Sequence, residues 1–387
     1  GSASGAVERF GAGSADNWWH GGGARCNPAT WSGAEPHGKR AHRRRSAPRR
    51  AADVDDDAPG DDDAARSWSS DVDRDSDARD WGRKFLATNG GSVYIDLHHL
   101  ELCTPEVRSA HEFVAAWHAM LRIARQALEA ANRRRGRHWR IQVLVNNSDG
   151  QGNSYGAHLN ILVSRRLWDD LFHYRAHYLA LLASYQASSI VLSGQGKVGS
   201  ENGRPAVAYQ LSQRADFFET LRGVQTTTAR PLVNSRDEAH CGARRGAGSA
   251  AGQREPPYAR MHCIFHDSNL CHVANLLKAG GMQMFLAMLE AGAAPPHLIL
   301  EDPLDAVVRF SHDPTLRARC RMADGRELTA VEHQRDVLEQ FQRFHDRGGF
   351  EDVVPRAGEI LALYADTLER LGEDRLDELA ARLDWVL

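Results

Sequence analysis

The stretch 90–106 gathers the side chains with the clearest chemical potential, including Asp96, Glu101 and two adjacent histidines. A β-branched and aromatic run around Tyr94 predicts a strand, and alternation along a strand places Tyr94 and Asp96 on the same face. Thr104, followed by a proline and an acid, predicts the start of a helix. Asp96 at a strand end, Glu101 five residues later and a helix N-terminus nearby suit a metal–nucleotide site. A solvated loop with two ordinary acids is the alternative.

The elements around this stretch would position it. Apolar residues at helical spacing predict an amphipathic helix over about 105–132, and alternation predicts strands at 139–145 and 157–163. The segment between these strands, 146–156, is dense in Asn, Ser, Asp and Gly, which are the residues that form turns. A long polar loop between two buried strands is where a scaffold usually carries function.

A glycine-rich motif follows a predicted helix at 167–186 and a predicted strand at 189–192. Residues 194–199 match the dinucleotide-binding pattern Gly-x-Gly-x-x-Gly. That motif requires a helix after it, but the sequence Glu-Asn-Gly-Arg-Pro at 201–205 breaks any helical pattern. Residues 194–199 therefore predict a hairpin or a loop.

The rest of the pattern is mixed at first and helical later. Strands are predicted at 209–214 and 261–265. The further predicted helices are 273–291, 303–311, 327–346 and 355–371. The sequence stops at Asp384-Trp385-Val386-Leu387 without a Gly or Pro to close a last helix, which predicts a missing continuation.

The composition argues against several classes of protein. The 387 residues carry a formal net charge of −3, which predicts neither a specific nucleic-acid partner nor an anionic membrane partner. A membrane-spanning helix needs a run of about 18 apolar residues, and the sequence has none. The six cysteines include no Cys-x-x-Cys pair, which favours a reducing cytoplasm over a disulfide framework.

Residues 1–80 differ in composition from the rest. Arginine dominates 39–50 and aspartate dominates 53–63, with Gly, Ser, Pro and Ala between them. Such a segment buries too little apolar surface to offset the entropy of ordering, so we expect 12–80 to be mostly disordered and 81–387 to hold the folded domain. A nucleic-acid-binding tail is the alternative for the arginine run, and the adjacent aspartates argue against it.

Two histidines raise the question of a zinc site. His262 and His266 lie four residues apart, a step that in an extended strand separates two residues by roughly 13 Å. That is too far for one tetrahedral zinc ion, so hydrogen-bonded core histidines are the expected state. A Cys–His nucleophilic pair stays open, although no spacing supports it.

Several motifs together resemble the Pup ligase and depupylase family. They are Tyr94-Ile95-Asp96, His99-Leu100-Glu101, Asn146-Asn147-Ser148-Asp149, Asn153–Asn160, Leu211–Glu219, Arg230-Pro231, Asn234–His240, His266–Asn269, Ala323–Glu327 and Asp384-Trp385-Val386. They run in unbroken order over about 82–387. The five-residue step from Asp96 to Glu101 and the run Arg-Ala-Asp-Phe-Phe-Glu resemble the depupylase branch more than the ligase branch.

The resemblance implies a fold and a reaction. The family is related to glutamine synthetase, so we expect an α+β fold in which a curved antiparallel sheet cradles ATP and Mg²⁺, with helices packed behind. It also implies that Pup and pupylated proteins are the partners. The implied reaction is depupylation or Pup deamidation, which attacks a γ-amide or isopeptide bond at the C-terminal residue of Pup.

Residue roles follow from the same resemblance. Asp96 matches the catalytic aspartate, a base or nucleophile, and Tyr94 and Glu101 match magnesium ligands. The implied nucleotide- or anion-binding residues are Thr104, Asn147, His158, Asn160, Arg214 and Arg236. A guanidinium can fork onto phosphate or onto a carboxylate of Pup, so we expect the two arginines to serve a ligand and not a pair with Asp216 or Glu238.

Several positions depart from the family pattern. The first strand of the family has its nearest equivalent at 5–11, where Val7 and Arg9 replace two glutamates. Leu159 replaces another acid, and Cys271-His272 stands where a glutamate is usual. The C-terminal domain of the family is also expected to be missing. Because each change removes negative charge or a contact, a pseudoenzyme that binds Pup or nucleotide is one alternative, and the Pup ligase direction is another.

Overall fold

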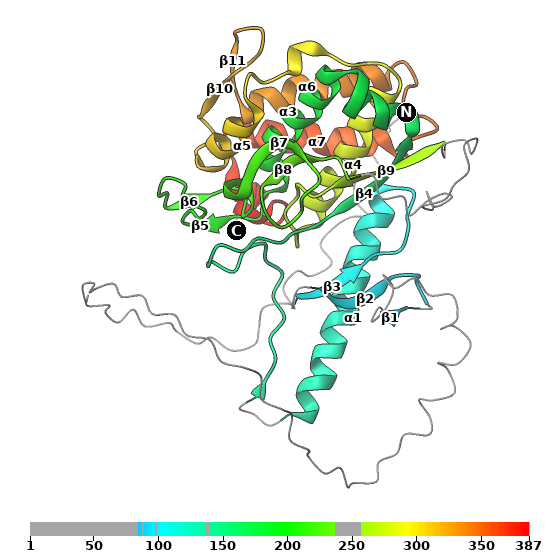
Figure 1. Cartoon of the computed structure of the whole chain (residues 1–387), viewed down its shortest axis with the longest axis vertical. Coiled ribbons are helices and arrows are strands. Elements are labelled where there is room, and N and C mark those ends of the chain that lie inside the picture. The colour runs from blue at the N-terminus through cyan, green and yellow to red at the C-terminus, as the bar shows by residue number, and fades with distance from the viewer. Residues whose placement is uncertain (1–83, 87, 97–98, 136–138, 237–256, 387) are drawn as a thin grey trace, which may run out of the picture. The chain divides into compact units, whose positions relative to one another are not determined.

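The computed structural model describes residues 84–86, 88–96, 99–135, 139–236 and 257–386 (Figure 1). The helices are α1 (Ala110–Arg134), α2 (Arg165–Asp169), α3 (Ala176–Ser193), α4 (His272–Glu290), α5 (Pro303–Ser311), α6 (Ala330–His345) and α7 (Ala357–Gly372). The strands are β1 (Lys84–Phe85), β2 (Ser92–Asp96), β3 (His99–Cys103), β4 (Leu159–Ser164), β5 (Lys197–Val198), β6 (Tyr209–Gln210), β7 (Phe218–Gly223), β8 (Arg230–Asn234), β9 (Tyr258–Cys263), β10 (Arg319–Arg321) and β11 (Glu327–Thr329). The predicted disorder at 12–80 and the predicted first strand at 5–11 lie outside the described residues.

The described strands pair as five small sheets. One is the antiparallel sheet β1-β2-β3, and the others are the pairs β4-β9, β5-β6, β7-β8 and β10-β11. Only β7 and β8 run parallel among the described strands. The mixture of helices and strands agrees with the predicted α+β class, but the single curved sheet is not confirmed. The antiparallel β5-β6 pair, whose first strand is Lys197–Val198, agrees with the hairpin or loop predicted at residues 194–199.

The predicted strand at 139–145 is wrong. A side chain of α1 takes the place of a neighbouring strand: the amide of Asn132 accepts from the Ile141 N–H at 2.8 Å and donates to the Ile141 carbonyl at 3.0 Å. Gln195 donates to the Val145 carbonyl at 2.9 Å. Each of these side-chain amides bonds the backbone of only one residue. Residues 139–145 therefore form no ladder of backbone hydrogen bonds with another described segment.

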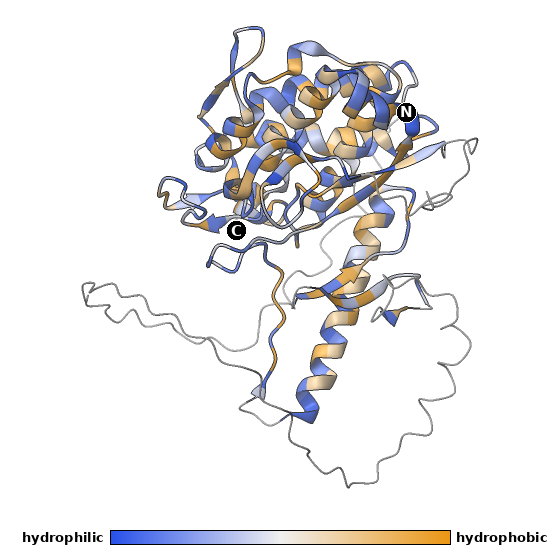
Figure 2. Ribbon diagram, viewed as in Figure 1, coloured by the Kyte–Doolittle hydropathy of each residue, from blue (hydrophilic) through white to orange (hydrophobic). Residues whose placement is uncertain are grey.

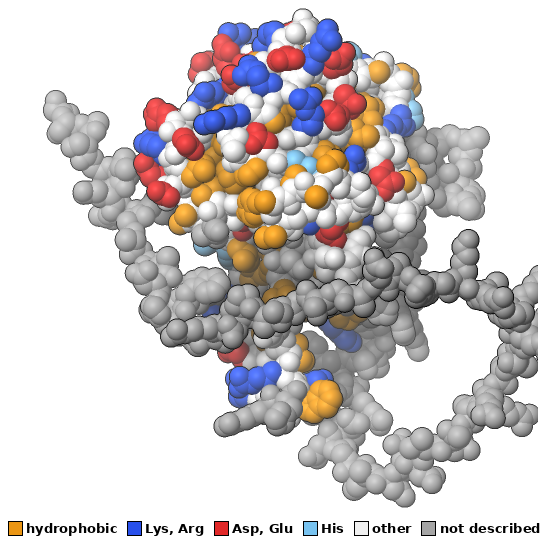
Figure 3. Space-filling model, turned by 90° about the vertical axis from the view of Figure 1, so that its left-hand side faces the viewer, with side chains coloured by type: hydrophobic (Ala, Val, Ile, Leu, Met, Phe, Trp, Pro, Cys, Tyr) orange, Lys and Arg blue, Asp and Glu red, His pale blue; other side chains and the backbone are white. Residues whose placement is uncertain are grey.

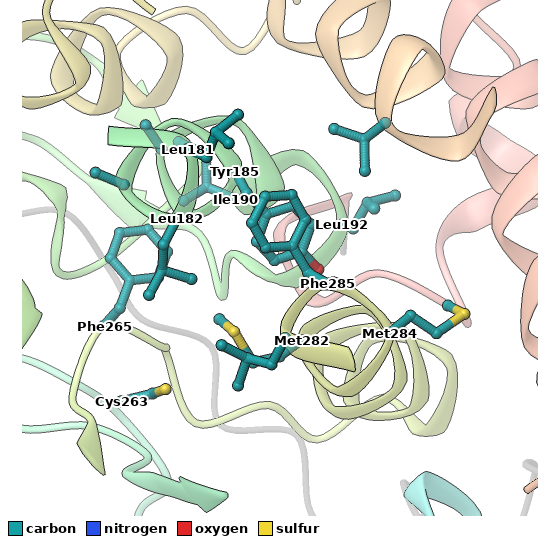
Figure 4. Packing of buried hydrophobic residues seen from close by; sticks show 14 of the residues in the cluster. Leu181, Leu182, Tyr185, Ile190, Leu192, Cys263, Phe265, Met282, Met284 and Phe285 are labelled. Atoms are coloured by element: carbon teal, nitrogen blue, oxygen red, sulfur yellow. The ribbon is translucent and has the colours of Figure 1, made fainter. Parts of the chain in front are cut away.

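Helix α3 lies at the centre of the core. Side chains on all sides of its C-terminal half are buried, and Tyr185 stacks on Phe285 of α4 with ring centroids 4.4 Å apart (Figure 4). The predicted helix end at 186 and the predicted strand at 189–192 are wrong, because a short apolar run does not distinguish a strand from a buried helix. The serines of this run stay helical since their hydroxyls bond to carbonyls of the preceding turn, as Ser193 does to Ser189.

Helix α1 begins later than predicted. Two N-cap signals stand five residues apart, at Thr104 and at Ser109, and the chain uses the second one. The Ser109 hydroxyl accepts from the Glu112 N–H at 3.1 Å, and Glu112 reaches back to the Arg108 N–H, an arrangement close to a capping box. The predicted helix start at Thr104 is therefore wrong. Blue and orange segments alternate along α1, in keeping with its predicted amphipathic character (Figure 2).

The later helices follow the sequence pattern closely. Those predicted at 273–291, 303–311 and 355–371 are confirmed as α4, α5 and α7, within two residues at each end. None of the helices in the described ranges is both long enough and apolar enough to cross a bilayer. Acidic and basic side chains are interspersed on the face in Figure 3.

A capping box sets the start of α6. The Thr329 hydroxyl accepts from the Glu332 N–H at 3.2 Å, and Glu332 accepts from the Thr329 N–H at 2.8 Å. Residues 327–329, predicted as helix, instead form β11. The capping box fixes Ala330 as the first helical residue because it satisfies two N–H groups that the helix leaves unpaired.

Replacing the cap tests this account of α6. Thr329→Ala should lower the free energy of unfolding by about 1 kcal/mol, because one cap hydrogen bond is lost. Urea denaturation measures the change, and the exposed Thr228→Ala is a control that should stay within about 0.5 kcal/mol of wild type. Equal losses in the two variants would contradict the capping role.

Candidate functional site

The β2-β3 hairpin carries three of the predicted site residues. Its register pairs Tyr94 with Glu101 and Asp96 with His99. Directly paired residues of antiparallel strands project to the same face, and so do alternate residues of one strand. All four side chains therefore lie on one face, as predicted for Tyr94 and Asp96. Strand β3 has no counterpart among the predicted strands.

Tyr94 keeps its proton in this setting. Its hydroxyl donates to Glu101 Oε2 at 2.5 Å. Burial raises the pKa of Tyr94, and its hydrogen bonds with Glu101 and Cys103 raise it further. Since Mg²⁺ prefers charged oxygen ligands, Glu101 offers the better ligand atom of the predicted pair, and Tyr94 holds that carboxylate in place. Asp96 is exposed, so its carboxylate is accessible to a ligand.

A group of polar side chains, mostly buried, lies beside loop 146–156. We call Asn147, Gln195, Gln213, Arg214 and Asp267 the buried network. The Asn147 N–H donates to Gln213 Oε1 at 2.7 Å, and its side-chain amide donates to Gln195. The side-chain oxygen of Asn147 accepts from the backbone of the segment after Asp267 at 2.7 Å. Asn147 thus connects three segments that are far apart in sequence.

Asp267 holds two of these segments through their backbones. Its carboxylate accepts from the N–H groups of Gln195 and Gln213, each at 2.9 Å, and from the Ser212 hydroxyl at 3.1 Å. Burial raises the pKa of Asp267, although these hydrogen bonds and the charge of Arg214 favour its ionised form. A buried carboxylate needs such donors to offset desolvation.

Lys278 of α4 connects the network to the last described residues. Its ammonium donates to the Asp267 carbonyl and to Asn269 Oδ1, both at 2.9 Å. Asn269 in turn donates to Asp384 Oδ2 at 3.1 Å. Burial lowers the pKa of Lys278 to about 8, while the charges of Asp384 and Asp267 oppose that shift. Motifs from four parts of the sequence therefore meet here.

Arg214 is the cationic centre of the network. Its side chain is 1% exposed, and its Nε and Nη1 atoms have no hydrogen-bond partner among the described residues. Burial lowers the pKa of Arg214 to about 10, Asp267 opposes this shift and Arg230 adds to it. A Cβ atom at Gly156 would lie 2.0 Å from Nη1, so residue 156 must be glycine for the guanidinium to fit. Asp216 pairs instead with Lys197 and His312.

His158 lies near this positive charge. Its pKa is below the ordinary histidine value, first because surrounding protein atoms displace water and then because Arg214 and His262 place positive charge beside it. Part of the residue still faces solvent. Its Nδ1 atom lies 3.4 Å from His262 Nε2. The positive potential here comes from Arg214 and Arg230, which also keep the His158 imidazole neutral, and such a region suits an anion.

One aromatic contact joins the hairpin to loop 146–156. The rings of His99 and Tyr155 have centroids 4.3 Å apart. Tyr155 precedes Gly156, which packs on Arg214, and His99 is the strand partner of Asp96. The structure thereby brings the Asp96 hairpin and the buried network together on two sides of Tyr155.

Three predicted ligand residues have other surroundings. Asn160 accepts from Arg260 Nη1 at 2.8 Å at an exposed position of the β4-β9 pair. The Arg236 N–H donates to the preceding Asn234 side chain at 3.0 Å, and its predicted partner Glu238 lies outside the described residues. Thr104 precedes α1 by six residues, so its predicted place at a helix N-terminus is wrong.

The residues that organise the site were missed by sequence reasoning. Asp267, Gln195 and Gln213 received no role, although each lies in a motif or a glycine-rich segment that was noted for another reason. The available signal was a run of polar residues directly after a buried strand, as in His266–Asn269. Such a run has to satisfy its polar groups inside the protein.

The Pup-ligase family model, described as Pup-ligase protein, matches residues 29–387. The chain belongs to this family. It is 38% identical over 304 residues to a depupylase from Acidothermus cellulolyticus, covering 78% of this chain and 56% of that protein. It is 34% identical over 312 residues to a Pup–protein ligase from Acidimicrobium ferrooxidans, covering 79% and 64%.

The structure resembles that of a solved family member. The Pup ligase PafA in complex with ADP matches with a TM-score of 0.63 and 25% identity, covering 79% of this chain and 63% of PafA. A complex of PafA with Pup matches with a TM-score of 0.60. The chain spans less than two thirds of the length of these relatives.

A buried histidine of this site gives a pH prediction. Burial, followed by the charges of Lys278 and Arg214, holds the pKa of His266 well below its ordinary value. Below about pH 6.5, His266 of the unfolded chain binds a proton, whereas His266 of the folded protein stays neutral. The free energy of unfolding therefore falls as pH falls. His266→Gln should remove about 1.4 kcal/mol per pH unit from that slope below about pH 6.

Urea denaturation of wild type and His266→Gln at several pH values measures the slope. The exposed His177→Gln controls for a general effect of the substitution. Parallel pH profiles of wild type and His266→Gln would contradict a neutral buried imidazole at this position.

Proposed function

We propose that this chain carries the ATP- and magnesium-dependent site of a depupylase or Pup deamidase. Such a site would cleave a γ-amide or isopeptide bond at the C-terminal residue of Pup. The relative named depupylase supports this reaction. The observation that carries the proposal is the exposed Asp96 carboxylate, which shares a hairpin face with Glu101. That hairpin contacts the loop over the buried Arg214.

The buried network fits the phosphate groups of a nucleotide. Two guanidinium nitrogens of Arg214, Nε and Nη1, have no partner among the described residues, and an unpaired buried charge is costly. An anion with several oxygens would supply what these donors lack. Arg230 adds positive potential at the same place, and the neutral His158 imidazole lies beside it. The similarity to PafA, which was solved with ADP, supports this assignment.

The hairpin fits magnesium only in part. Glu101 and Asp96 provide charged oxygens, whereas Tyr94 keeps its proton and is a weaker ligand. No set of three or more His, Cys, Asp or Glu side chains in the described ranges is arranged to hold a metal ion. Mg²⁺ commonly binds one or two carboxylates together with substrate phosphates, so nucleotide would complete this site. Bound magnesium would neutralise phosphate charge.

Asp96 is the residue that would act on the bond. As a base, its carboxylate would take a proton from the attacking water. As a nucleophile, it would bond to the γ-carbonyl carbon while the C–N bond breaks and the amine takes a proton from water, and a water molecule would then split the acyl–Asp96 bond to give the free acid and the carboxylate. Tyr94 and Glu101, hydrogen-bonded to each other, would fix the orientation of the face that carries Asp96.

Two observations favour alternative functions. Leu159 of β4 is buried, at 6% exposure, and it stands where the family carries an acid. This position therefore has no carboxylate, which favours a pseudoenzyme that binds Pup. The ligase direction draws support from the Pup–protein ligase relative and from PafA.

Asp96→Asn tests the enzyme. The amide is nearly isosteric and accepts hydrogen bonds, but it is neither a base nor a carboxylate nucleophile. Release of Pup from a conjugate, with ATP and magnesium present, should fall by about 10²–10⁴-fold or more, while Pup binding stays within about threefold. The exposed Asp352→Asn should keep full activity. Wild-type protein without isopeptidase, deamidase or ligase activity would establish the pseudoenzyme, and full activity of Asp96→Asn would remove Asp96 from the mechanism.

Arg214→Lys tests the anion site. Lysine keeps the charge and loses the planar fork, so the dissociation constant for ATP with magnesium should rise about tenfold or more, which corresponds to about 1.4 kcal/mol. Arg236→Lys should act in the same direction. Titration calorimetry measures the affinity, and Arg165→Lys is a control at another buried arginine. Lost stability with unchanged ATP affinity would assign the arginine a structural role.

A further inference from the structure

A second buried carboxylate, Asp216, lies in the segment after Arg214. It is fully buried and accepts from His312 Nε2 at 2.7 Å, from Gln210 Nε2 at 2.7 Å and from the Glu201 N–H at 2.8 Å. The Lys197 ammonium lies 3.5 Å from it. Burial alone would raise the pKa of Asp216, but these donors together hold it below the ordinary value. Asp216 is therefore a fixed negative charge inside the protein.

Glu201 connects this charge to loop 146–156. Its carboxylate accepts from the Ser148 hydroxyl and from the Gly152 N–H, the latter at 3.0 Å, and it pairs with Lys197. The backbone of Glu201 is itself held by Asp216. Lys197, with one tenth of its side chain exposed, bridges the two carboxylates. One buried anchor thus holds the two sides of the loop tip.

His312 closes the anchor from the other side. It is the residue after α5, and its side chain is 12% exposed. It lines a surface pocket of about 430 Å³ together with Arg204 and Arg309. Arg204 donates to the backbone carbonyl of Asp216 at 3.4 Å. The anchor is therefore built from α5 and the β5-β6 connection, and neither element contributes a residue to the proposed reaction.

The loop passes this constraint on to the hairpin. Ser148 and Ser154 form a bridge across the loop, and the Tyr155 N–H donates to the Asn147 carbonyl at 3.1 Å. Tyr155 then contacts His99, the strand partner of Asp96. Asn147 itself has separate anchors in the buried network. Loss of the Asp216 anchor should therefore displace Tyr155 and the hairpin more than it disturbs the nucleotide contacts.

We infer that His312 and Asp216 are positioning residues for Asp96. They hold the loop tip through Glu201, and the loop places Tyr155 against the hairpin that carries the reactive carboxylate. The inference rests on the proposed function for its effect on turnover, whereas its structural part, the anchoring of loop 146–156, can be measured without activity. It predicts that turnover depends on the anchor and that nucleotide affinity does not.

The test compares His312→Ala with His312→Gln, whose amide can still donate to Asp216. His312→Ala should speed hydrogen exchange of the Gly152 amide at least tenfold. It should lower kcat for Pup release about tenfold, with the ATP dissociation constant within about twofold of wild type. His312→Gln should restore most of both losses. Ser148→Ala removes the other end of the anchor and should reproduce them.

His333→Ala is the matched control. His333 is fully buried and uses both ring nitrogens, at 2.8 Å to Ser188 and at 2.9 Å to the Leu298 carbonyl, but it packs within the helical core. Its loss should lower stability and leave Gly152 exchange and kcat unchanged.

The outcomes separate the inference from the proposed function. Unchanged Gly152 exchange in His312→Ala and Ser148→Ala, or faster exchange with unchanged kcat, would overturn the inference. An inactive wild-type protein whose Gly152 exchange still speeds up in both variants would refute the proposed activity and support the anchor. A loss of ATP affinity that matches the loss of kcat would also overturn the inference, because the anchor would then support nucleotide binding and not the position of Asp96.

Discussion

The charge of Arg214, buried and only partly compensated, is the constraint on which the rest of the site depends. A guanidinium that is 1% exposed needs negative charge and hydrogen-bond acceptors nearby, because burying an uncompensated charge is costly. Asp267 supplies the charge, and it fixes Gln195 and Gln213 through their backbones. Gly156 is required because the guanidinium lies against its backbone. The positions of three loops thus follow from the accommodation of one cation.

The site divides its work between a buried part and an exposed part. The buried network contains the positive charge of Arg214, two of whose nitrogens have no hydrogen-bond partner among the described residues, whereas Asp96 is exposed at the end of a short strand of the hairpin. Such a hairpin has little core of its own, so its placement depends on contacts such as that between His99 and Tyr155. In the proposed site, the buried network would bind the phosphate groups, and loop 146–156 would fix the position of Asp96 by supporting the hairpin.

The sequence predicted local elements better than the contacts between them. The helix at 303–311 was clear because Asp302 caps it and its apolar face is regular, and the shared face of Tyr94 and Asp96 followed from strand geometry. Periodicity failed at 189–192, where every side of the element is buried. The partners of Asp267 lie more than 50 residues away in sequence, so no spacing rule could join them. Resemblance identified the family but not this network.

In the proposed site, the hairpin face and Arg214 would bind opposite ends of one metal–phosphate group. A crystal structure with a non-hydrolysable ATP analogue and Mn²⁺ in place of Mg²⁺ tests it most directly. We expect an anomalous Mn²⁺ peak beside Glu101, within reach of Asp96, and phosphate oxygens hydrogen-bonded to Arg214. A nucleotide bound away from Arg214, or Mn²⁺ remote from the β2-β3 hairpin, would contradict it.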